Sequence, residues 1–159
     1  MSIERYLATP YGLRVLRDRV KQIKEVDRPE NVRDIEEARA HGDLSENAEY
    51  HAAKERQGLL DAELRSLEDK VSRADVIDPT TLSGDKVVFG ATVDLINIDT
   101  DDEVTYQIVG IDEADLKEGK ISYASPLGRA IIGREEGDEI EFRAPGGTRN
   151  YEVVEVRFL

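Results

Sequence analysis

Two long stretches of the chain repeat apolar residues at intervals of three and four, the spacing of one face of an α-helix. The first repeat consists of Leu13, Leu16, Val20, Ile23 and Val26, and the second of Leu60, Leu64, Leu67, Val71 and Ala74. Mostly polar residues lie between them, so each helix would carry a single apolar face. We therefore predict two amphipathic helices that pack against each other as an antiparallel hairpin.

The ends of these helices are marked by residues with known terminal preferences. Thr9 and Pro10 are expected to begin the first helix, with threonine as the N-cap and proline at the first helical position. This helix is expected to continue to about Ala40, to bend at Pro29, which cannot donate a backbone hydrogen bond, and to end at Gly42. The second helix is expected over about 44–74. At ~1.5 Å per residue, an arm of about 30 residues would be roughly 45 Å long.

The second half of the chain has the pattern of a small sheet domain. The strand-like runs are Thr92 to Ile98, Val104 to Val109, Glu139 to Phe142 and Tyr151 to Val156. In the first run the alternation of apolar and polar residues shifts at Ile96. The sequence Pro145-Gly146-Gly147 predicts a hairpin turn between the last two strands. Ser125 is expected to cap a short helix, Leu127 to Ile132.

These elements predict an α+β fold with an N-terminal helical hairpin and a C-terminal antiparallel sheet that carries a short helix. The expected domains are residues 1–78 and 86–159, joined by a linker, 79–85, of turn-forming composition. No apolar run is long enough to span a bilayer, and no signal peptide is evident, so we expect no membrane partner. The absence of cysteine excludes disulfides and thiolate metal sites and is consistent with a reducing cytoplasm.

Net charge argues against one class of function and leaves another open. A formal charge of −13 disfavours non-specific binding to nucleic acid phosphates. The first helix nevertheless has a basic flank, which consists of Arg14, Arg17, Arg19, Lys21, Lys24, Arg28, Arg33 and Arg39. This flank has two interpretations: a solvated face with intrahelical ion pairs, such as Asp18 with Lys21 and Glu25 with Arg28, or a local patch that faces RNA.

Asp43 and Glu46 are the candidate chemical groups, because they lie where the hairpin turns. Their spacing of three matches a capping box at the start of the second helix. The same spacing holds two carboxylates within one turn, and carboxylate oxygens are ligands that Mg²⁺ prefers. Both interpretations can hold together.

No complete catalytic constellation is visible elsewhere. His41 and His51 flank the turn but are too few for a zinc site, and Ser45 in an exposed turn lacks the oriented imidazole that a nucleophilic serine needs. The run from Gly133 to Gly137 lacks the Gly-Lys-Ser/Thr of a phosphate-binding loop. The chain therefore looks catalytically incomplete by itself.

The run from Gly42 to Glu55, GDLSENAEYHAAKE, closely resembles the coiled-coil tip of bacterial Gre transcript-cleavage factors of the GreA type. The runs Gly119 to Asp138 and Ala144 to Val156 resemble that family's second domain, so the resemblance covers nearly the whole chain. It implies a coiled-coil hairpin and a C-terminal domain of FKBP-like fold that docks on RNA polymerase. The hairpin would enter the secondary channel of a backtracked polymerase.

By the same resemblance, Asp43 and Glu46 would help to hold an Mg²⁺ ion of the polymerase and position the attacking water. The polymerase's own active site would then cleave the RNA near its 3′ end, so the chain itself is no enzyme and has no cofactor of its own. Ser45, Asn47 and Tyr50 would contact the partner, and Ser45 replaces a basic residue often found between the tip acids. We expect a cytoplasmic monomer.

Three alternatives remain at this point. A related inhibitor of the anti-Gre type would occupy the polymerase channel without promoting cleavage. A prolyl isomerase needs an aromatic-walled pocket, and the chain offers only scattered candidates in Tyr106, Tyr123 and Phe142. A coiled-coil adaptor would need no chemistry at the tip at all.

Overall fold

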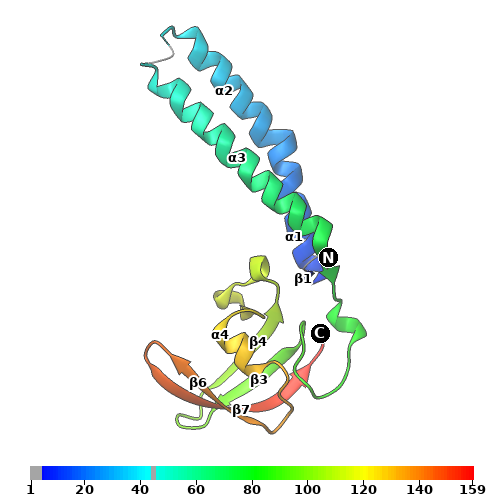
Figure 1. Ribbon diagram of the computed structural model, residues 1–159. Coiled ribbons are helices and arrows are strands. Elements are labelled where there is room, and N and C mark those ends of the chain that lie inside the picture. The colour runs from blue at the N-terminus through cyan, green and yellow to red at the C-terminus, as the bar shows by residue number, and fades with distance from the viewer. Residues whose placement is uncertain (1–4, 44–45) are drawn as a thin grey trace. The chain divides into compact units, whose positions relative to one another are not determined.

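The computed structural model describes residues 5–43 and 46–159, which form two compact units. One unit is a helical hairpin formed by Leu13–Ala74, and the other combines Arg5–Gly12 with Asp75–Leu159 around a curled sheet (Figure 1). The predicted α+β fold, with an N-terminal helical hairpin and a C-terminal sheet domain, is confirmed.

The hairpin consists of two helical arms. The first arm comprises α1 (Pro10–Gln22), a π-helical turn η1 (Ile23–Asp27) and α2 (Arg28–Ala40), and the second is α3 (Ala48–Arg73). The hydroxyl of Thr9 accepts a hydrogen bond from the Gly12 N–H at 3.1 Å, which confirms the predicted start of α1 at Pro10. Figure 1 shows α2 and α3 running side by side.

The irregularity expected at Pro29 lies just before it, in η1. There the Arg28 N–H donates to the carbonyl of Ile23, five residues back, and Pro29 falls in the first turn of α2. Because proline lacks an N–H and crowds the preceding turn, a widened turn at this point lets the arm remain helical through Pro29. The wider turn also shifts the apolar face, since Val26 is 46% exposed although it continues the predicted repeat.

The hairpin buries little apolar area. Ile23, Leu60 and Leu64 form its core, and Val20 and Leu67 pack against them. Closer to the tip the buried residues are Asn31 and Ala38, and the Asn31 amide donates to the Ala53 carbonyl at 2.9 Å. The part of the hairpin near the tip is therefore aligned by polar contacts and by a small side chain.

Ion pairs connect the two arms. Lys24 lies 2.7 Å from Glu68, and Arg28 lies 3.7 Å from Asp61 instead of pairing with Glu25 as expected. Arg19 donates to Glu63 at 2.7 Å and to Asp27 at 2.8 Å. Arg19, Lys24 and Arg28 of the basic flank are therefore paired inside the hairpin, which weakens its interpretation as a patch that faces RNA.

Replacing Glu63 with Gln should lower hairpin stability at neutral pH and have less effect in acid. The hydrogen bond from Arg19 holds the pKa of the Glu63 carboxyl below its ordinary value. A carboxyl whose pKa is lower when folded stabilises the fold above its unfolded pKa, and this contribution is lost as the pH falls through the folded pKa. Since the pair is partly exposed, the effect should be about 1 kcal/mol or less. The difference in melting temperature between wild type and E63Q, measured from pH 7 to pH 3, should shrink; a constant difference would contradict the assignment.

The second unit is built on a five-stranded sheet with the strand order β5-β4-β3-β7-β6. Its strands are β3 (Thr92–Asn97), β4 (Glu103–Val109), β5 (Lys120–Ser122), β6 (Glu139–Ala144) and β7 (Gly147–Arg157). All neighbours are antiparallel except β4 and β5, a parallel pair whose short edge strand had not been predicted. The hairpin turn after Ala144 is confirmed, because Ala144 pairs with Gly147 across β6 and β7.

Helix α4 (Pro126–Ile131) carries the predicted Ser125 cap, whose hydroxyl accepts from the Gly128 N–H at 3.1 Å. Fully buried residues from the sheet and this helix form the core, among them Leu95, Ile108 and Ile131. The register shift expected at Ile96 occurs one residue earlier, between Asp94 and Leu95.

Short elements at the start of the chain complete the second unit. Strand β1 (Tyr6–Ala8) pairs with β2 (Ala74–Val76), and three short 3₁₀ turns occur at Pro79–Thr81, Ile111–Glu113 and Leu116–Glu118. The Thr9 N–H donates to the Glu113 carboxylate at 3.0 Å, and the Tyr6 hydroxyl donates to Asp112. Burial and this bond raise the pKa of Tyr6 above its ordinary value. These contacts explain why Arg5–Gly12 belongs to the second unit.

Candidate functional site at the hairpin tip

The hairpin tip begins where α2 ends at Ala40. The His41 N–H donates to the Ala38 carbonyl at 3.2 Å, and Gly42 follows with a φ of 113°, a conformation that favours glycine. The predicted end of the helix at Gly42 is confirmed. Asp43 and Glu46 are both exposed, whereas Leu44 and Ser45, and with them the partner contact predicted for Ser45, lie outside the described residues.

Asn47, and not Asp43, caps the second arm. Its side-chain oxygen accepts a hydrogen bond from the Tyr50 N–H at 3.1 Å, and α3 starts at Ala48, four residues later than predicted. The capping-box interpretation of Asp43 and Glu46 is therefore wrong, because both residues precede the cap. Asp43, Ser45 and Asn47 all have side chains that can cap a helix. The sequence alone did not show which of them caps α3.

The same Asn47 side chain also reaches the first arm. Its amide nitrogen donates to the carbonyl of Ala38 at 2.6 Å, while Ala38 itself is 3% exposed. Asn47 was singled out in the sequence only as a partner contact, and nothing in the residue pattern indicated this bond between the arms.

Asp43 and Glu46 line one shallow hollow of about 370 Å³, which His41, Asn47, Ala48 and Glu49 complete. The structure therefore brings the two predicted acids to one concave surface. In the parts of the chain that the structure describes, no group of three or more His, Asp or Glu residues is arranged to hold a metal ion. Two carboxylates suit an ion such as Mg²⁺, which keeps several waters and takes further ligands from elsewhere.

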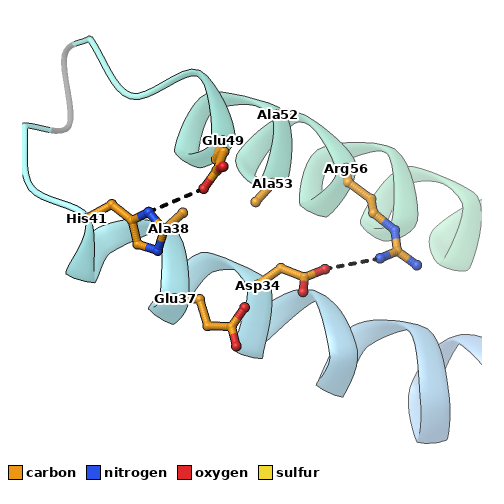
Figure 2. Close-up of a pocket in the computed structure, with 8 residues that line it drawn as sticks. All are labelled: Asp34, Glu37, Ala38, His41, Glu49, Ala52, Ala53 and Arg56. Atoms are coloured by element: carbon orange, nitrogen blue, oxygen red, sulfur yellow. Dashed lines mark ion pairs between the residues drawn. The ribbon is translucent and has the colours of Figure 1, made fainter.

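A second hollow, of about 580 Å³, lies between α2 and α3 beside the tip (Figure 2). Its lining residues are Asp34, Glu37, Ala38, His41, Glu49, Ala52, Ala53 and Arg56. Two side-chain contacts cross it, between His41 and Glu49 at 3.6 Å and between Arg56 and Asp34 at 3.5 Å. Both pairs are exposed and contribute about 1 kcal/mol at most, so they align the arms only weakly.

The tip is strongly acidic. Residues 34–49 contain six acidic side chains and one arginine, a formal charge of −5 with neutral histidine. Such a surface attracts cations and repels phosphates. Tyr50 is half-buried, and its ring lies edge-on to the ring of the exposed His51 with 5.7 Å between the ring centroids.

Two further observations bear on the alternatives. One hollow of the second unit, of about 400 Å³, is lined by Ile98, Asp99, Glu139, Ile140, Glu141 and Asn150 and has no aromatic walls of the kind that a proline-binding pocket requires. None of the helices in the described parts of the chain has the length and apolar character needed to cross a membrane.

Known proteins match both units. The family described as "Transcription elongation factor, N-terminal" matches residues 6–76, and "Transcription elongation factor, GreA/GreB, C-term" matches residues 82–158. Transcription elongation factor GreA of Rhodospirillum rubrum is 56% identical over 156 residues, covering 98% of this chain and 99% of the relative. GreA of Brucella anthropi is 54% identical over 157 residues, which cover 99% of this chain and 100% of that relative. A solved structure of the transcription factor Gfh1 is 27% identical in sequence, with a TM-score of 0.47, and the match covers 98% of this chain and 99% of that chain.

Proposed function

We infer that this chain, which belongs to the GreA/GreB family of transcription elongation factors, stimulates transcript cleavage by a backtracked RNA polymerase. The observation that carries the proposal is the position of Asp43 and Glu46. Both carboxylates are exposed on one hollow at the tip of the hairpin, and neither is needed to cap α3. Both side chains are exposed to solvent, where a partner can reach them.

The hairpin is suited to deliver these groups into a buried site. Helix α3 has 26 residues, which at ~1.5 Å per residue gives an arm of about 39 Å. Two paired helices are narrow for that length, so the tip can pass through the secondary channel of the polymerase to its active site. The second unit would dock on the outside of the enzyme and keep the tip at a high effective concentration.

In that site Asp43 and Glu46 would each place a carboxylate oxygen on an Mg²⁺ ion shared with the polymerase. The chemistry supplied there by a bound Mg²⁺ would be a lowered pKa of a water molecule and stabilisation of charge on the phosphate that is cut. The chain's own residues would contribute ligands and orientation only. Tyr50 and Ser45 remain proposed contacts to the polymerase or to the RNA 3′ end, and we propose that the protein acts as a monomer.

The comparisons favour cleavage over inhibition. Relatives at 52–56% identity over nearly the whole chain carry the name of elongation factors. No observation in the described residues supports the anti-Gre alternative specifically.

The test follows RNA length in stalled, backtracked elongation complexes of a bacterial polymerase. We expect the protein to shorten 5′-labelled RNA and to restore elongation when nucleotides are added, and to leave free RNA intact without polymerase. Inhibited elongation with RNA of unchanged length would assign the protein to the channel-blocking class instead.

A further inference from the structure

Asn47 joins the two arms of the hairpin at their ends. Its side-chain oxygen accepts from the Tyr50 N–H at 3.1 Å, in the first turn of α3, and its amide nitrogen donates to the Ala38 carbonyl at 2.6 Å, in the last turn of α2. The amide offers an acceptor and a donor on separate atoms, so it can make both bonds at once. The side chain thus caps one helix and is bonded to the end of the other.

The helix cap by itself does not require asparagine. Asp and Ser are comparable N-cap residues, and each can accept the Tyr50 N–H. An ionised aspartate, however, has no hydrogen to donate to Ala38, and serine is too short to reach as far as the amide does. The bond to Ala38 is therefore the feature that distinguishes Asn47 from an ordinary cap.

The acids of the tip lie between the two joined residues. Asp43 and Glu46 are in the segment that follows Ala38 and precedes Asn47, and Asn47 lines their hollow. Tying the ends of a short segment reduces the number of conformations open to it. Two exposed side-chain contacts between the arms near the tip contribute little, and the buried Asn31 amide bonds to Ala53 at positions farther from the turn. The Asn47 bond to the buried Ala38 is therefore the constraint placed closest to the two acids.

We propose that Asn47 is a positioning residue for transcript cleavage, which holds the ends of α2 and α3 together so that Asp43 and Glu46 reach the metal ion in one geometry. The proposal rests on the proposed function. It differs from the sequence-based expectation that Asn47 contacts the partner, since the side chain acts within the hairpin and its effect should already be measurable in the free protein.

The experiment compares Asn47→Asp and Asn47→Ser, which keep the cap, with Ser125→Ala, which removes the cap of α4 in the second unit and controls for a general loss of stability. At saturating protein we expect both Asn47 variants to cleave RNA about tenfold more slowly or worse, since small misplacements of reacting groups have effects of this size. The concentration for half-maximal cleavage and the melting temperature should stay close to wild type. Agreement between the two variants excludes the added charge of aspartate as the cause.

A second readout needs no polymerase. Because the chain contains no cysteine, spin labels can be placed at the exposed positions Arg39 and Lys54, one on each arm. We expect a narrow distribution of distances in the otherwise unchanged protein and a broader one in both Asn47 variants. Cleavage at the wild-type rate in N47D and N47S would overturn the proposal, as would reduced affinity for polymerase with unchanged label distances. If the unsubstituted protein stimulates no cleavage, the proposed function fails, and the label distances still decide whether Asn47 fixes the tip.

Discussion

Asp43→Ala and Glu46→Ala should each abolish stimulated RNA cleavage, with a loss of about 100-fold or more, and leave polymerase binding close to wild type. Both side chains are exposed and line one hollow, and α3 is capped by Asn47 instead. Their removal therefore costs the hairpin little stability but removes oxygen ligands from the reaction. The measurements are the cleavage rate in backtracked complexes and competition with labelled wild-type protein for polymerase.

A nearby acid provides the matched control. Glu37 is exposed on α2 within the acidic region but does not line the hollow of Asp43 and Glu46. Glu37→Gln removes the same unit of charge and should cleave at nearly the wild-type rate. The contrary result is retained cleavage in the Asp43 and Glu46 variants, with a free energy of unfolding lowered by about 1 kcal/mol, as expected for the loss of a helix cap. That result would assign the two acids a structural role in place of the chemical one.

The largest effect on stability is expected from Ile23→Ala. Ile23 is fully buried in the π-helical turn and packs with Leu60 and Leu64 in one buried apolar cluster of the hairpin. Removing its side-chain carbons should lower the free energy of unfolding by about 2–5 kcal/mol. This is a large share of the stability that a core of this size provides. We expect the helical circular dichroism signal to melt at markedly lower temperature, and cleavage to fall with it.

Val26 offers the control for this variant. It lies in the same turn but is 46% exposed, so Val26→Ala should change the melting temperature little. The signals of residues in the second unit, followed by amide resonances, should be retained in I23A at temperatures where the hairpin has melted. Equal melting of I23A and V26A would contradict the assignment of the core.

The long elements could be predicted because their signals are local. Apolar residues at intervals of three and four marked both arms, and Thr9, Gly42 and Ser125 marked helix ends through their own backbone or side-chain chemistry. The turn after Ala144 follows from the conformations that proline and glycine allow. Each of these features depends on residues a few positions apart.

The features that could not be predicted depend on distant partners. Strands β1, β2 and β5 have three residues each, too few to show an alternation, and β1 pairs with a segment nearly 70 residues away. The irregularity predicted at Pro29 occurs before it, in the π-helical turn Ile23–Asp27, and Val26 in that turn is exposed. At the tip, several residues were able to cap α3, and Asn47, which does so, also bonds to Ala38 on the other arm.

A titration of Mg²⁺ tests most directly whether the tip acids act as metal ligands. Cleavage by backtracked complexes is measured over a range of Mg²⁺ concentrations with no protein, with wild type and with the Asp43→Ala and Glu46→Ala double variant, each protein at saturation. We expect wild type to lower the Mg²⁺ concentration for half-maximal cleavage, and the bound double variant to leave it where it lies without protein. Equal Mg²⁺ dependence with wild type and with the double variant would show that Asp43 and Glu46 do not supply ligands to the ion.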